Sequence, residues 1–365
     1  MLPPPGIGAF IALESEVPVA NAPTVADFWL WPLQWGQMFS RAQAPPPPPE
    51  AVWTTPNEIV ADLPTMRLRR FTTEARGPAP VLVVAPYAVH DSHIADLAKG
   101  HSLVAALAAC GLGPIFLTEW KSATPDRASL SIDSYLADLN IAVDLADAQP
   151  DLVGLCQGGW LSLLYAAAFP RKVRRLAAIG APVDTSHPSN LAQGARLLPS
   201  ALVEDAIAAD GGLVNGATTL AAFRASGGAE TDAAAILQTG RESDPAALEA
   251  FTAWDARTLD LPGRYYTDVL NWLFRENRLA EGTFPAFGRP TPLSQVDAPL
   301  YLLAGSQDAI APPPQVRAAT TLVGSSRENI VYAEADCGHL SLFLGARTLR
   351  EEWPKIGKWL RANSE

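Results

Sequence analysis

Cysteine is scarce in this sequence, with three residues among 365: Cys110, Cys156 and Cys337. Three cysteines cannot all pair in disulfides, and none of them has the C-x-x-C spacing that often binds zinc. The sequence therefore predicts neither a disulfide-rich secreted domain nor a structural zinc site, and a reducing cytoplasm suits it. We expect no metal and no other cofactor.

Long apolar runs and basic clusters are also missing. No stretch approaches the roughly 20 apolar residues that a transmembrane helix needs. Glu14 and Glu16 interrupt the first apolar segment, which no basic region precedes, so we expect no secretory signal. The 27 Lys and Arg residues stand against 38 Asp and Glu, and this net charge of −11 argues against nucleic-acid binding.

The first 54 residues are rich in proline and aromatic residues. Residues 45–49 are five consecutive prolines, which predict a polyproline spacer or edge. Residues 28–39 form an aromatic amphipathic stretch with two possible roles. It is either a helix packed on its own domain or a segment that docks on a partner or a surface.

Strands and helices alternate from residue 55 onwards. The Val-rich run at 80–85 predicts a buried strand of the kind that parallel sheets use. The other elements expected before the interruption are a strand pair within 56–75, strands at 114–120, 150–153 and 174–180, and helices at 101–109, 131–148 and 160–168. This order is typical of a doubly wound, mainly parallel α/β sheet.

The alternation stops over residues 184–296, which are rich in Ala and Leu at helical spacing and contain no clear strands. Strands at 299–305 and 329–333 and a closing helix at 342–362 then resume the pattern. We therefore predict a core made of 55–183 and 297–365, with 184–296 inserted as a helical cap over the active site.

Cys156 stands in Gly154-Leu155-Cys156-Gln157-Gly158-Gly159, between a predicted strand and a predicted helix. Glycines on both sides permit the sharp turn of a nucleophile elbow, which exposes its central side chain at the top of a sheet. A buried cysteine in a glycine-containing loop is the structural alternative. The partners expected of a nucleophile distinguish the two interpretations.

Asp308 and His339 each follow a predicted strand, at the carboxyl end where open α/β sheets place their sites. The chain order nucleophile, acid, histidine is that of the α/β-hydrolase fold. His339 would take the thiol proton, and Asp308 would orient the imidazole and stabilise its cation. Taken singly, such an Asp is usually a cap and such a His structural, but three residues in this order favour a catalytic triad.

The backbone N–H groups of Gln157 and Val89 are the candidates for an oxyanion hole, because the fold takes one donor after the nucleophile and one from the loop after the first buried strand. We expect five side chains to contact the substrate. They are His90 in that loop, Trp160 in the elbow helix, and Trp254, Tyr265 and Tyr266 in the cap.

These motifs resemble those of the polyhydroxyalkanoate synthases, which polymerise hydroxyacyl-CoA into storage polyester. The resemblance runs from about Thr55 to the C-terminus and is closest to the short catalytic subunits. Besides the elbow it rests on 120–135, Ala181-Pro182-Val183-Asp184, Trp254 with Leu261-Pro262-Gly263-Arg264-Tyr265-Tyr266, Asn277-Arg278-Leu279 and the ending at 353–360. It implies Cys156, Asp308 and His339 as the triad, self-association or a partner subunit, and a cytoplasmic setting on polymer granules.

Two positions depart from the synthase pattern. Ala309 stands where synthases usually have a His after the triad Asp, and Arg257 stands where the cap motif usually has an Asp. The loop at 85–90 is similar to that of intracellular polyhydroxyalkanoate depolymerases.

Three functions follow from the motifs and these departures. The first is a synthase-like acyltransferase that takes 3-hydroxyacyl-CoA as its substrate. The second is a depolymerase or thioesterase that uses the same triad with water as acceptor. The third is a catalytically idle subunit that uses residues 28–39 and the tryptophans to bind polymer granules or a second protein.

Overall fold

The computed structural model describes residues 51–362, apart from 75–76, 148, 226–229 and 240–243. The aromatic stretch at 28–39 and the proline run at 45–49 therefore lie outside the described residues. Residues from 44 to the C-terminus belong to one compact unit. The architecture below refers to the described part of that unit.

An eight-stranded sheet forms the centre of the unit, in the order β1-β2-β6-β3-β7-β8-β13-β14. Its strands are β1 (Asn57–Asp62), β2 (Met66–Phe71), β3 (Val81–Val84), β6 (Ile115–Trp120), β7 (Asp151–Leu155), β8 (Arg175–Ile179), β13 (Leu300–Gly305) and β14 (Ile330–Ala335). Strand β2 is antiparallel to both of its neighbours, and all pairs from β6 to β14 are parallel. The predicted mainly parallel sheet is confirmed.

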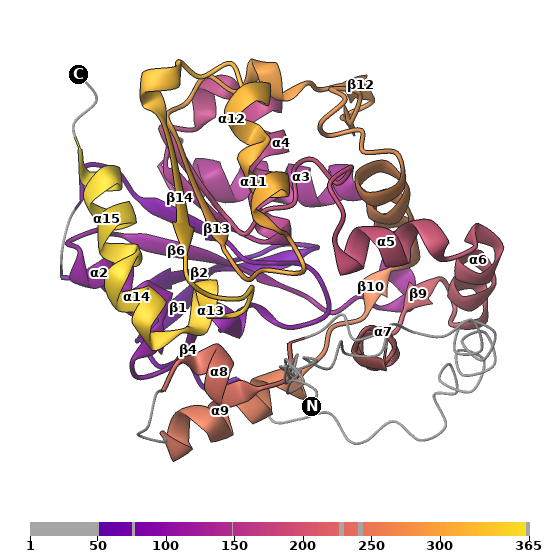
Figure 1. The fold of residues 1–365 in the computed structure, drawn as a ribbon, viewed down its shortest axis with the longest axis horizontal. Coiled ribbons are helices and arrows are strands. Elements are labelled where there is room, and N and C mark those ends of the chain that lie inside the picture. The colour runs from indigo at the N-terminus through magenta and orange to yellow at the C-terminus, as the bar shows by residue number, and fades with distance from the viewer. Residues whose placement is uncertain (1–50, 75–76, 148, 226–229, 240–243, 363–365) are drawn as a thin grey trace, which may run out of the picture. The chain divides into compact units, whose positions relative to one another are not determined.

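Helices cover both faces of this sheet, which buries its central strands completely (Figure 1). Helices α2 (Leu103–Ala109) and α15 (Trp353–Arg361) pack together on one face, and α3 (Ile132–Leu145), α4 (Gln157–Ala168), α11 (Pro313–Arg317) and α12 (Ala319–Leu322) lie on the other. Every residue of β3 and of β7 is buried. A strand covered on both faces needs apolar residues in succession, which explains the Val-rich run at 81–84.

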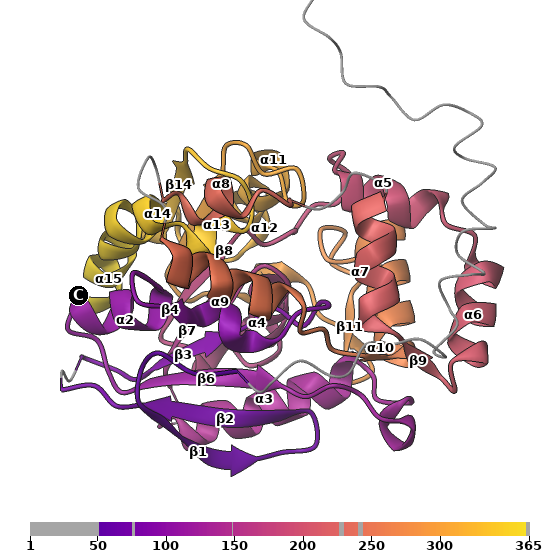
Figure 2. The ribbon, with the colours of Figure 1, turned by 90° about the horizontal axis from the view of Figure 1, so that it is seen from below.

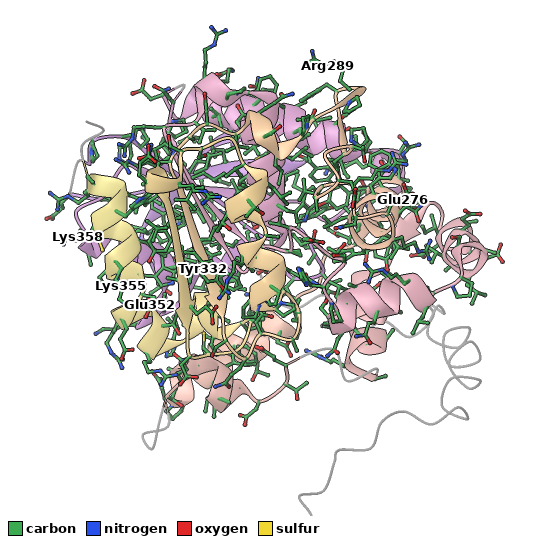
Figure 3. All side chains as sticks on the ribbon, turned by 45° about the horizontal axis from the view of Figure 1, so that its top comes forward. Glu276, Arg289, Tyr332, Glu352, Lys355 and Lys358 are labelled. Carbon is green, nitrogen blue, oxygen red and sulfur yellow. The ribbon has the colours of Figure 1, made fainter. Side chains whose placement is uncertain are left out.

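The predicted closing helix at 342–362 is wrong as a single element. The chain forms α13 (Ser341–Leu344), α14 (Ala346–Glu351) and α15 in succession. Gly345 interrupts the first two with an extended backbone (ψ 121°), and Pro354, which has no N–H to donate, lies in the first turn of α15. Lys355 and Lys358 point away from the sheet on the outer side of α15 (Figure 3).

Between β8 and β13 the chain makes α5 (Asn190–Leu197), α6 (Ser200–Ala209), α7 (Gly216–Ala225), α8 (Ala233–Leu237), α9 (Pro245–Asp255), α10 (Gly263–Asp268) and a π-helix (Val269–Arg275). We call residues 184–296 the insertion. It also has two short strand pairs, β9 (Leu213–Val214) with β10 (Leu261–Pro262) and β11 (Pro285–Ala286) with β12 (Arg289–Pro290), which the helical pattern did not predict.

Before α2, residues at 101–102 belong to a strand and not to the predicted helix. The short pair β4 (Asp96–Ala98) and β5 (His101–Ser102) occupies this position, and the Ser102 hydroxyl caps α2 by accepting the Ala105 N–H. Among the described helices none combines the length and the apolar character needed to cross a membrane.

Candidate active site

Cys156 sits at a sharp turn between β7 and α4, as the elbow motif predicts. Its backbone has φ 49° and ψ −112°, which is an unusual conformation for a residue with a side chain. The Cys156 N–H donates to Ile179 O in the neighbouring strand β8 (2.8 Å). A hydrogen bond to the sheet therefore holds the strained residue in place. Strain of this kind is common at functional sites.

Gly158 permits the close approach of α4 to the end of β3. A Cβ atom on Gly158 would lie 2.0 Å from Val84 O and 2.7 Å from Ala85 O, both of which are backbone atoms. Only glycine fits in this contact. It brings the first turn of α4 beside the loop that follows β3, from which the second oxyanion donor is expected.

Asp308 and His339 meet at the carboxyl ends of the adjacent strands β13 and β14. His339 Nδ1 lies 2.6 Å from Asp308 Oδ2, and both side chains are buried. The other oxygen, Asp308 Oδ1, accepts the backbone N–H groups of Ile310 and Ala311, both at 2.8 Å. The carboxylate is therefore fixed from two sides and cannot rotate away from the imidazole without losing backbone hydrogen bonds.

Electrostatic interactions at His339 link it to Cys156. Burial lowers the pKa of the His339 ring, but the Asp308 carboxylate and the Cys156 sulfur outweigh it, so the pKa lies well above the usual value. The ring also contacts Phe343 edge-on, with 5.4 Å between centroids. The structure thus brings the three predicted triad residues together and favours a protonated imidazole beside the sulfur.

The two oxyanion candidates remain predictions. Gln157 is the first residue of α4, and its side-chain Oε1 accepts the Trp160 indole N–H (2.9 Å). Val89 uses its carbonyl to accept the Leu259 N–H of the insertion (2.8 Å). The loop that carries Val89 is therefore attached to the insertion.

His90 and Trp254 join the same loop to α9. Their rings stack at 4.4 Å between centroids, His90 Nε2 lies 3.2 Å from Asp255 Oδ1, and the buried Trp254 indole donates to Asp91 O (3.2 Å). Burial raises the pKa of the Asp255 carboxyl, but His90 and Arg224 outweigh it and leave the pKa below its usual value. These contacts give both rings a structural role, and their contact with substrate stays a prediction.

The remaining predicted substrate contacts lie in different surroundings. Tyr265 is buried in a cluster with Tyr135 (4.6 Å between centroids) and Tyr87 (5.1 Å). Burial, Tyr87 and Cys156 all raise the pKa of Tyr265, so its hydroxyl interacts electrostatically with the thiol. Burial also raises the pKa of Tyr266, but its charged neighbour is Arg275 within the insertion. Trp160 is fully buried.

Two residues of the site were not predicted from the sequence. Tyr135 completes the tyrosine cluster from α3, and Glu230 in the insertion accepts the His339 N–H (2.5 Å). Tyr135 lies in the stretch 120–135 that carries the family resemblance, which was a usable signal. Glu230 has no local motif, because its partner is 109 positions away in the chain.

A polar cavity of about 560 Å³ lies at the β2 and β6 side of the unit. Trp53, Arg69, Glu119, Lys121 and Arg257 are among its lining residues, and none of the predicted site residues lines it. Among the described residues no group of three or more His, Cys, Asp or Glu side chains is arranged to hold a metal ion.

Comparison with known proteins places the chain in a family. The family model for the alpha/beta hydrolase fold matches residues 119–346. Poly(3-hydroxyalkanoate) polymerase subunits are similar over most of the chain. The one from Synechocystis is 28% identical over 84% of this chain and 84% of its own length. The one from Allochromatium vinosum is 28% identical over 78% and 81%.

The polymerase subunit from Haloferax mediterranei is longer. It is 25% identical over 86% of this chain, and the match covers 65% of that relative's own length. Among solved structures, the monoacylglycerol lipase from Paleococcus ferrophilus superimposes with a TM-score of 0.53 at 19% identity, over 82% of this chain and 99% of its own. With the sheet order and the elbow, these matches show that the chain belongs to the α/β-hydrolase fold family and resembles the poly(3-hydroxyalkanoate) polymerases within it.

Proposed function

We propose that this protein is a polyhydroxyalkanoate synthase-like acyltransferase that uses 3-hydroxyacyl-CoA. The observation that carries the proposal is the grouping of Cys156, His339 and Asp308 at the carboxyl ends of β7, β14 and β13. A thiol in an elbow, with a histidine and a fixed carboxylate, suits covalent acyl transfer. The polymerase subunits that the chain resembles give the substrate class.

In the first step the Cys156 thiolate attacks the thioester carbonyl. The carbon–sulfur bond to CoA breaks, and the protonated His339 gives its proton to the departing CoA thiolate. The acyl group is then held on Cys156 as a new thioester. Since one thioester replaces another, this step is nearly balanced in energy. Throughout the step, the buried pair with Asp308 keeps the His339 imidazole oriented.

In the second step the hydroxyl of a growing chain end attacks the Cys156 thioester. Neutral His339 removes the hydroxyl proton, an oxoester forms, and the Cys156 thiolate leaves. Water must be excluded, or the same intermediate hydrolyses. In this proposal the packed aromatic rings of the buried tyrosine cluster, Tyr87, Tyr135 and Tyr265, take this task.

Hydrolysis is the second candidate function, and one feature of the sequence favours it. Ala309 follows the acid residue where synthases usually have a histidine, so the chain departs from the synthase pattern next to the triad. The triad would then pass the acyl group to water as a depolymerase or thioesterase. Self-association, a partner subunit and attachment to cytoplasmic polymer granules belong to the first proposal.

One assay separates the two functions. Purified protein is incubated with 3-hydroxybutyryl-CoA, and CoA, polymer and free 3-hydroxybutyrate are followed together. CoA with polymer supports the acyltransferase, and CoA with an equal amount of free acid supports a thioesterase. A depolymerase is tested in parallel by the loss of turbidity of amorphous polymer granules. Cys156→Ala removes the proposed nucleophile, whereas Cys110→Ala removes a half-buried thiol that is the C-cap of α2 and serves as the matched control. Equal activity of wild type and Cys156→Ala contradicts both proposals.

A further inference from the structure

The loop that carries His339 is held by a carboxylate from the insertion. The backbone N–H of His339 donates to Glu230 Oε1 (2.5 Å), and that of Leu340 donates to Glu230 Oε2 (2.9 Å). Both N–H groups come just before α13 begins at Ser341. One carboxylate thus satisfies two adjacent backbone donors, and hydrogen bonds to an ionised acceptor are the stronger kind.

Gly338 leaves the space that this carboxylate occupies. A Cβ atom on Gly338 would lie 2.3 Å from Glu230 Oε1 and 3.0 Å from its carboxyl carbon. Because any larger residue at 338 would displace the carboxylate, the glycine before His339 and the acid at 230 fit together as a pair. The close fit at Gly338 agrees with the hydrogen bonds that join Glu230 to the His339 loop.

A second contact fastens the same part of the insertion further along the chain. Gln238 Oε1 accepts the backbone N–H (3.0 Å) and the hydroxyl (3.1 Å) of Thr348 in α14. The Ser341 hydroxyl donates to Ile236 O (2.8 Å). Helix α8 therefore lies against α13 and α14, as Figure 2 shows, and Glu230 is presented to His339 from a segment that is itself anchored.

We infer that Glu230 is a positioning residue for His339. Asp308 holds the imidazole ring by its Nδ1 atom, and Glu230 holds the backbone of the same residue. With both contacts in place the ring has one position relative to Cys156. Without Glu230 the two N–H groups lose their acceptor, the backbone at 339–340 shifts, and the ring loses alignment with the sulfur. A misplacement of about 1 Å in an active site can reduce the rate by about 100-fold.

The test compares wild type, Glu230→Ala, Glu230→Gln and the matched control Gln238→Ala. The first readout needs no substrate: it is the low-field proton NMR resonance of His339 Nδ1–H, which reports the hydrogen bond to Asp308. We expect Glu230→Ala to broaden or shift this resonance and Gln238→Ala to keep it. Glu230→Gln retains one acceptor oxygen in the same volume, so we expect it to have an intermediate effect on the resonance. If Glu230→Ala does not fold, Glu230→Gln takes its place in the comparison.

The second readout is CoA release, and it rests on the proposed function. We expect kcat to fall by about 10- to 100-fold in Glu230→Ala, with KM changed only slightly, because alignment and not binding is lost. An unchanged resonance and unchanged kcat in Glu230→Ala would overturn the inference. An equal loss of kcat in Gln238→Ala would also overturn it, because Glu230 would then act only as an anchor of α8. If wild type itself releases no CoA, the proposed function fails, and the NMR comparison still decides the role of Glu230.

Discussion

At the scale of single residues, Asp308 performs two tasks with its two oxygens. Oδ2 faces His339 Nδ1, and Oδ1 accepts two backbone N–H groups of its own loop. An asparagine can keep the second task with its amide oxygen. Its NH₂ group would then face the ring, where it meets an N–H donor and forces the other tautomer on the imidazole.

Asp308→Asn should therefore retain the fold and lose the chemistry. We expect kcat for CoA release to fall by about 10³- to 10⁴-fold, as loss of the triad carboxylate does in serine proteases. Stopped-flow measurement of the first turnover checks this against Cys110→Ala. A loss smaller than tenfold would contradict a catalytic role for the carboxylate.

The raised pKa of His339 has a consequence for stability against pH. The pKa of His339 is higher in the folded than in the unfolded protein, so protonation of the ring stabilises the fold. This stabilisation is fully present below the unfolded pKa of about 6.5 and is lost as pH rises through the folded pKa. Urea unfolding of wild type and His339→Gln at several pH values measures it. We expect the difference between their free energies of unfolding to be largest near pH 6 and to shrink in the alkaline range. A difference that grows with pH would contradict a raised pKa.

At the scale of elements, the elbow depends on how closely α4 approaches β3. Gly158→Ala places a methyl group 2.0 Å from Val84 O, so the helix start must move. We expect the free energy of unfolding to fall by about 1–3 kcal/mol and CoA release to fall with it.

Gly194→Ala is the matched control for this substitution. Gly194 lies inside α5, and a Cβ atom there would meet no atom within 4 Å. Alanine should therefore stabilise this helix by roughly 0.5–1 kcal/mol. Equal stability of the two variants in urea unfolding would contradict the close approach at Gly158.

The core elements could be predicted from the sequence because their signals are local. The apolar run at 81–84, the glycines around Cys156 and the positions of Asp308 and His339 after their strands each lie within a few residues. The break at Gly345 could not be predicted in this way. A Cβ atom on Gly345 would lie 2.4 Å from Gln238 Oε1, and this neighbour lies in a distant part of the chain. Glu230 escaped prediction for the same reason.

At the scale of the whole molecule, the insertion contacts both loops that complete the site. Helix α9 meets the loop after β3 through Trp254 and Asp91, and Arg257 pairs with Asp91 (2.6 Å). The segment from Glu230 to Gln238 meets the loop after β14. The insertion is therefore fastened to the core at two places on either side of Cys156.

We expect the insertion and the core to unfold together. Hydrogen exchange followed by mass spectrometry through a urea titration should give one midpoint for peptides from α9 and from α4, as two-state unfolding requires. The α2 peptide, which lies on the face of the sheet away from α4, provides an internal reference for the core. Loss of protection in α9 at a lower urea concentration would contradict this coupling.

The contact between Glu230 and the His339 loop also limits how such proteins can be redesigned. Under the proposed function, exchange of the insertion between relatives is an obvious route to a new acyl-chain preference, because the insertion contributes Tyr265, whose pKa the Cys156 thiol raises. Such an exchange would also remove the acceptor of the His339 and Leu340 N–H groups. A functional chimera must therefore transfer residues 230–238 and 337–348 as one unit, with Gly338 included.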